Sequence, residues 1–177
     1  MTIIRYPKLS HEYFICKGIY CVMRKKDAYD DIDMLLKDLK FDIEDTLMDE
    51  VLDEVKDIEL KHIEQDVYET YTPKIYVRRS NDGIGDPDNI VGEVHNMQLE
   101  VDNVASFNED YGTHNHGTGL ATLLNDGNSL NGYFYDFPGE FTQPRPFLDH
   151  TEEEIEKTDS VENALAKGLK RRNYDVI

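Results

Sequence analysis

GTGLATLLNDGNSLNGYFYDFPGEFTQPRPFLDHT, residues 117–151, joins the middle of the chain to its C-terminal part. It begins with a short apolar segment, residues 120–124, and a polar turn, residues 125–128. The aromatic stretch 133–137 predicts a strand, because aromatic residues favour extended structure. The proline-bounded sequence 144–147 then predicts a rigid corner before a helix. The whole stretch is therefore predicted to connect a sheet to a C-terminal helix.

Upstream, a long helix is predicted from Asp27 to about Tyr71. Apolar residues recur there at steps of three and four, as on one face of a helix: Ile32, Leu36, Leu39, Ile43, Leu47, Val51, Val55 and Ile58. Unbroken, this helix would be about 65 Å long, with residues 40–42 as one place where it could bend. Residues 27–72 carry seventeen Asp and Glu against four Lys, a net of −13 within a chain total of −18. The helix surface is therefore expected to be strongly acidic, facing solvent or a lumen.

Between these two regions the pattern changes to that of strands. Residues 74–79 are β-branched and aromatic, and the apolar residues of 90–101 alternate with polar ones. The intervening residues 80–89 are rich in Gly, Asp and Asn and predict a turn. After the corner, Thr151 and Glu154 have capping-box spacing, which predicts that the C-terminal helix begins there.

The predicted fold class is α+β, with a small antiparallel β-sheet flanked by the long acidic N-terminal helix and a C-terminal helix. Residues 1–26 are expected to form an arm or a small hairpin. Residues 27–177 are expected to form a single α+β domain, a common size for one domain.

Charge and composition exclude several classes of function. A net charge of −18 argues against direct binding to nucleic acid or to an anionic membrane, since phosphate contacts need clustered Lys and Arg. No run of about 18 apolar residues predicts a transmembrane helix, and the N-terminus lacks the pattern of a signal peptide. Cys16 and Cys21 have no second cysteine pair, so we interpret them as ordinary thiols instead of zinc ligands or a disulfide.

Possible metal ligands occur in two places. The carboxylates of the long helix lack the Glu-x-x-His pattern of a carboxylate-bridged site. His114 and His116 could hold a weak metal site with Glu109 or Asp110, but an exposed flexible loop is the preferred interpretation. We therefore assign no catalytic residue, no cofactor and no metal ligand, and we expect an assembly protein instead of an enzyme.

Three segments, residues 120–128, 144–148 and 162–171, resemble the small tail-completion or neck proteins of long-tailed phages, a family also found in prophages and among minor tail components. The resemblance implies a structural virion protein without a catalytic residue, assembled in the host cytoplasm. It also implies a ring, with a hexamer as the expected form, between portal-side and tail-tube proteins. Packaged DNA would pass through its lumen without specific binding, and no membrane would be involved.

Four residues are candidates for a subunit or partner interface: Arg145, Phe147, Tyr133 and Tyr135. A rigid corner would project the Arg145 guanidinium toward a neighbouring carboxylate and the Phe147 ring toward a pocket. Alternatively, Phe147 packs under the last helix and Arg145 bonds within its own chain. Packing in the chain's own core is the preferred reading for the two tyrosines.

Two other functions remain open from the sequence. The acidic helix could mimic DNA and inhibit a DNA-binding protein. Less favoured is a metal-dependent nuclease centred on His114 and His116, because nucleases of that type need a basic surface facing DNA.

Overall fold

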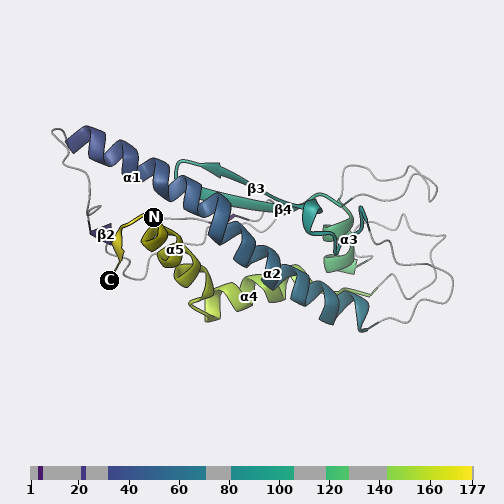
Figure 1. Cartoon of the computed structure of the whole chain (residues 1–177). Coiled ribbons are helices and arrows are strands. Elements are labelled where there is room, and N and C mark those ends of the chain that lie inside the picture. The colour runs from purple at the N-terminus through teal and green to yellow at the C-terminus, as the bar shows by residue number, and fades with distance from the viewer. Residues whose placement is uncertain are drawn as a thin grey trace. The chain divides into compact units, whose positions relative to one another are not determined.

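The computed structural model describes residues 4–5, 21–22, 32–70, 81–105, 119–127 and 143–176 (Figure 1). The predicted strands 74–79 and 133–137 and the loop that holds His114 and His116 lie outside these ranges. The fold class is α+β, as predicted. None of the helices in the described ranges combines the length and the apolar character that crossing a lipid bilayer requires.

The predicted long helix is present and is built from four consecutive segments. These are α1 (Ile32–Thr46), η1 (Leu47–Val51), α2 (Leu52–His62) and η2 (Ile63–Tyr68). Residues 40–42, one place where the sequence allowed a bend or a split, lie inside α1, so the helix does not split there. Departures from α-helical geometry occur instead at η1 and η2, which are π-helical turns. Such turns insert extra residues into a helix and are frequent at functional sites.

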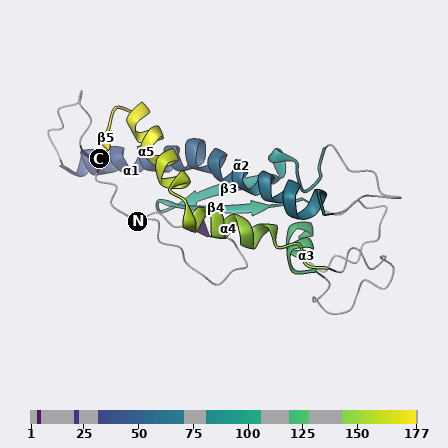
Figure 2. The ribbon, with the colours of Figure 1, turned by 90° about the horizontal axis from the view of Figure 1, so that it is seen from below.

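Short strands form two small sheets. In the larger one the strand order is β1 (Ile4–Arg5), β4 (Gln98–Asn103) and β3 (Ile90–His95). β1 pairs parallel to β4, and a two-residue turn with positive φ at Asn96 and Met97 connects β3 to β4. Figure 2 shows β3 and β4 side by side. Leu99 and Val101 are fully buried, which confirms the alternation seen in the sequence.

The second sheet pairs the two ends of the chain. β2 (Cys21–Val22) runs antiparallel to β5 (Asp175–Val176). β2 lies within residues 1–26, the predicted arm or small hairpin.

The predicted C-terminal helix is two helices, α4 (Phe147–Lys157) and α5 (Ser160–Arg171). The expected capping box is wrong: Thr151 lies within α4, and its hydroxyl donates to the carbonyl of Phe147 over 2.7 Å. Pro146 takes the role of helix start, since its carbonyl accepts from the amide of His150 over 2.9 Å. The side chain of Glu154 instead contacts His62 of the long helix.

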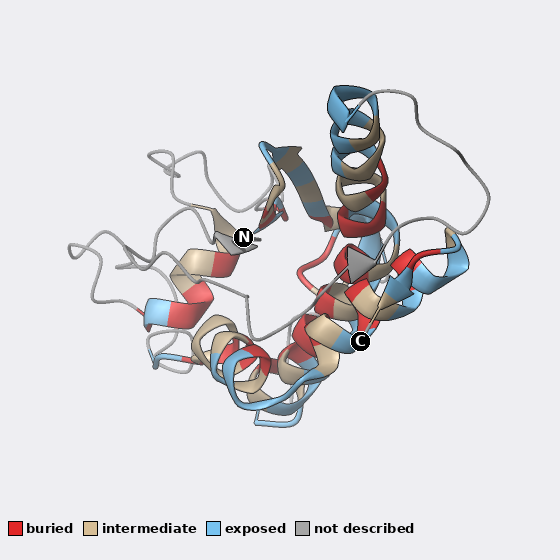
Figure 3. Ribbon diagram, turned by 90° about the vertical axis from the view of Figure 1, so that its left-hand side faces the viewer, coloured by how far each residue is buried: buried red, intermediate tan, exposed pale blue. Residues whose placement is uncertain are grey.

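The chain divides into two compact units. Unit 1 comprises residues 1–55, 92–101 and 158–177, and unit 2 comprises residues 56–91 and 102–157. In unit 1, α5 packs on α1 and η1. α5 and α1 approach closely at Gly168, where an added Cβ would lie 2.4 Å from Thr46 Cγ2. Figure 3 shows that the helices carry both buried and exposed residues, as amphipathic helices do.

The core of unit 2 brings together η2, the turn after residue 81 and two further helices. One of these is a short helix, α3 (Leu120–Asp126), formed by the apolar segment 120–124 and the two residues after it. The buried residues of the unit 2 core are Ile63, Val67, Ile84, Ala105, Ala121, Leu124 and Phe147. A 3-10 turn, η3 (Pro87–Asn89), leads into β3, which confirms that residues 80–89 include a turn. This core packs α4 against η2, which brings His150 next to Asp66.

Candidate functional site

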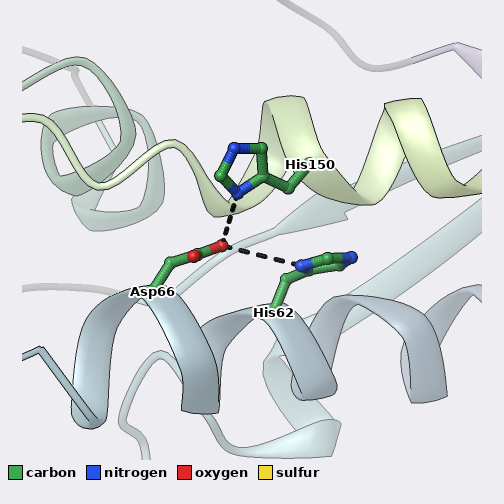
Figure 4. A group of neighbouring side chains, drawn as sticks. All are labelled: His62, Asp66 and His150. Carbon is green, nitrogen blue, oxygen red and sulfur yellow. Dashed lines mark hydrogen bonds and ion pairs between the residues drawn. The ribbon is translucent and has the colours of Figure 1, made fainter.

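Two histidines and an aspartate converge in unit 2 (Figure 4). His150 Nδ1 lies 2.9 Å from Asp66 Oδ2, and His62 Nδ1 lies 3.6 Å from the same oxygen. One potential ligand atom from each residue can be chosen so that all three lie within 4.8 Å of one another. Figure 4 shows the Asp66 carboxylate between the two imidazoles. Of the described residues, these three form the one group of His, Cys, Asp or Glu with the spacing of a metal site.

The helices explain why these side chains meet. His62 ends α2 and Asp66 follows four residues later in the π-turn η2. A spacing of four places two side chains on the same face of a helix, so both point toward α4. His150 lies in the first turn of α4, which packs on η2. The Pro146 start of α4 therefore sets the position of the third residue.

The other nitrogen of His62 is also engaged. Its Nε2 lies 2.9 Å from Glu154 Oε2, and Glu154 also accepts from Lys61 Nζ over 2.5 and 2.7 Å. Hydrogen bonds from Lys61, and then from His62, lower the pKa of the Glu154 carboxyl below its usual value. A carboxylate acceptor at Nε2 favours a proton on that nitrogen. The other ring nitrogen, Nδ1, is the atom that faces Asp66.

The three side chains of the site differ in exposure. The side chain of His62 is 12% exposed and that of Asp66 is 20% exposed, whereas His150 is 43% exposed. The His62 Nδ1 atom is buried and has no hydrogen-bond partner among the described residues. Two imidazole nitrogens and a carboxylate oxygen together form a donor set suited to a divalent transition-metal ion.

The structure places Arg145 and Phe147 inside the chain's own fold. Phe147 is fully buried in the core of unit 2. The Arg145 side chain is largely buried, and its backbone amide donates to the carbonyls of Leu124 and Asn125 at the end of α3. These positions favour the alternative in which both residues act within their own chain. A role in an interface stays a prediction for them, as it does for Tyr133 and Tyr135, which lie outside the described residues.

Sequence reasoning did not find the site. Neither the Glu-x-x-His pattern, which the long helix lacks, nor the pair His114 and His116 points to these three residues. The available signal was the His62-x3-Asp66 spacing on a predicted helix. His150 could not be added from the sequence, because it is 84 residues away from Asp66 and reaches it only through the packing of α4 on η2.

Comparison with known proteins identifies the family. Neither the curated proteins nor the solved structures contain a significant match to this chain. The sequence model of the YomN family matches residues 31–171, which include both π-turns, the His62, Asp66 and His150 site and the start of α4. Because this match extends over most of the chain, the protein belongs to the YomN family, which is phage-derived.

Proposed function

We propose that this protein is a structural component of the phage neck or tail, where it acts in tail completion or head-to-tail joining. It assembles as a ring, with six copies expected, and docks between the head connector and the tail tube. Membership of a phage-derived family supports a phage protein. The observation that carries the assembly role is an exposed apolar stripe on the long helix.

The apolar stripe consists of Met34, Phe41 and Met48, which are 61%, 62% and 39% exposed. Residues seven apart on a helix drift by only about 20° per step, so the three lie on one face. Lys37, Asp38 and Asp45 are their neighbours at helical spacings of three and four. An apolar centre with a charged rim is the usual composition of a protein interface. Burial of the stripe against a partner protein is therefore more favourable than its exposure to water.

We assign the stripe to a second copy of this chain. The long helix is strongly acidic, whereas Lys167 and Lys170 on α5 are exposed and basic. An acidic surface of one copy and a basic surface of the next are complementary but different, so the contact is head-to-tail. A head-to-tail contact that closes by rotation generates a ring. The acidic charge of such a ring would also repel DNA passing through it.

The assembly is tested with the full-length chain by native mass spectrometry and sedimentation. The Phe41→Glu variant places a charge in the middle of the stripe and is expected to give monomers, while its circular dichroism and melting temperature stay unchanged. Val104→Glu is the matched control, because Val104 is 50% exposed and lies away from the long helix in sequence. This control should assemble as the wild type does. Equal assembly of the Phe41→Glu variant would exclude the stripe as the interface.

The location is tested in the phage that encodes the chain. The protein should be found in purified particles, and deletion of its gene should leave filled heads and tails unjoined. A strictly monomeric protein that also fails to bind portal-side and tail-tube proteins would overturn the proposal. Salt-sensitive capture of a DNA-binding protein, without assembly, would support an acidic inhibitor that mimics DNA.

A further inference from the structure

We propose that His62, Asp66 and His150 bind one divalent transition-metal ion, and that Zn²⁺ is the ion they fit best. The bound ion would link α4 to the long helix within unit 2. This inference is independent of the assembly role, because it concerns contacts within a single chain.

The unpartnered nitrogen of His62 is the first observation. Glu154 engages Nε2, whereas Nδ1 is buried without a hydrogen-bond partner among the described residues and lies 3.6 Å from Asp66 Oδ2. A buried polar atom without a hydrogen-bond partner destabilises the folded state. A cation between the two atoms would satisfy both. It would also engage Nδ1 of His150, which already contacts the same carboxylate oxygen.

The donor set indicates which ion would bind. Imidazole nitrogens suit Zn²⁺, Co²⁺, Ni²⁺ and Cu²⁺, whereas Mg²⁺ and Ca²⁺ prefer oxygen ligands throughout. With metal–ligand distances of about 2.0–2.2 Å, the ligand atoms of a tetrahedral zinc site lie roughly 3.3 Å apart. Here the ligand atoms lie within 4.8 Å of one another. A small rotation of the exposed His150 side chain would therefore complete the three-residue set and leave a fourth position for water.

Glu154 supplies the second observation. A metal-bound histidine usually donates its other ring N–H to a carboxylate, which fixes the orientation of the ring and strengthens the ligand. The 2.9 Å contact between His62 Nε2 and Glu154 has this arrangement before any metal binds. Lys61 also donates to Glu154, from its Nζ to Oε1 over 2.7 Å.

Binding would have a structural consequence. His62 and Asp66 belong to the long helix, while His150 lies 84 residues after Asp66 on α4. A metal that joins them closes a long loop and stabilises the folded state in proportion to the logarithm of the free-ion concentration. Without metal, the same residues would form a simple hydrogen-bond network in which Asp66 accepts from His150.

The experiment uses the full-length protein, stripped with a chelator and titrated with ZnCl₂ by calorimetry. We expect one ion per chain and a rise in melting temperature with Zn²⁺ concentration. Co²⁺ should give the visible absorption bands of tetrahedral coordination with nitrogen ligands. His150→Ala should lower the affinity for Zn²⁺ at least about 100-fold, more than the loss of an outer partner costs. Glu154→Gln should lower it about 10-fold.

Two control variants make the result specific. His95→Ala removes a histidine whose side chain is 65% exposed and contacts Glu93 on β3, so it should bind Zn²⁺ as the wild type does. The double variant His114→Ala/His116→Ala should also bind normally. His150 is itself substantially exposed, so its replacement by Ala should leave the circular dichroism spectrum unchanged. The proposal is overturned if the wild type binds no ion at one per chain, if His150→Ala binds as tightly as the wild type, or if the double variant abolishes binding.

Discussion

Asn103 donates its side-chain amide to Glu59 Oε1 over 2.9 Å in the interior of unit 2. Glu59 is fully buried, and its second carboxylate oxygen has no hydrogen-bond partner among the described residues. Burial raises the pKa of the Glu59 carboxyl to about 7, against the lowering effect of the Asn103 hydrogen bond and with a small contribution from the charge of Asp102. Glu59 is therefore a buried acid that loses its proton near neutral pH.

The first prediction is a stability that falls as pH rises through this range. A carboxyl whose pKa is higher in the folded state than in the unfolded state binds its proton more tightly when folded. Its contribution to stability is fully present below about pH 4.5 and is lost by about pH 7. Glu59→Gln removes the charge, so the variant should gain stability relative to the wild type as pH rises from 5 to 8. Chemical denaturation at several pH values measures this difference, and parallel curves for the two proteins would contradict it.

The fold could be predicted where local pattern decides it. The three-four spacing of apolar residues identified the long helix, and alternation identified β4, because each pattern reports one buried face. The π-turns η1 and η2 were missed, since they depend on how the helix packs and not on its own residue types. The division into α4 and α5 was missed as well. Thr151 and Glu154 have capping-box spacing, but Pro146 starts the helix one turn earlier.

The site could be predicted only in part. The His62 and Asp66 pair is readable as a spacing of four on a helix face. Its partner His150 and the supporting Glu154 come from a segment that the sequence alone could not place against the helix. The sequence predicted a helix after the proline-bounded residues 144–147, and α4 begins at Phe147. It could not tell whether the side chains of Arg145 and Phe147 point inward or outward. The direction of the Phe147 side chain depends on tertiary packing, because it is fully buried in the core of unit 2.

The second prediction concerns the close approach of α5 to α1 at Gly168. A Cβ at this position would lie 2.4 Å from Thr46 Cγ2 and 2.6 Å from Glu50 Oε2, closer than real Cβ contacts. Gly168→Ala should therefore lower the free energy of unfolding by about 1–3 kcal/mol through overpacking. Gly119→Ala is the matched control, because nothing lies within 4 Å of its Cβ position and its φ of −63° suits alanine. Denaturant titration of both variants compares them, and an equal effect would contradict the close approach of α5 to α1.

The third prediction concerns the hydrogen bond between Tyr174 and Asp42. The Tyr174 hydroxyl donates to Asp42 Oδ2 over 2.6 Å, and both residues are buried in unit 1. Tyr174→Phe removes this buried hydrogen bond to a carboxylate, which should cost about 1–3 kcal/mol. In the background of Asp42→Ala the same change should cost much less, since the hydrogen bond is already absent. A double-mutant cycle measures this coupling, and equal costs in the two backgrounds would show that the bond contributes nothing.

Asn125 carries the fourth prediction, because it joins α3 to the start of α4. Its Oδ1 accepts from the backbone amide of Leu148 over 2.9 Å. That amide belongs to the first turn of α4, where backbone donors have no partner within the helix. Asn125→Ala should lower the free energy of unfolding by about 1–2 kcal/mol, the usual cost of losing a helix cap.

The control for Asn125 is Asn163→Ala, which replaces an exposed asparagine within α5. This variant should change stability by about 0.5 kcal/mol or less, as surface substitutions usually do. Hydrogen exchange adds a local readout, because only Asn125→Ala should speed exchange of the amides in the first turn of α4. Since His150 lies in that turn, Asn125→Ala should also weaken Zn²⁺ binding at His62, Asp66 and His150, whereas Asn163→Ala should not. Unchanged exchange in the first turn of α4 would show that the cap is not what holds this helix start in place.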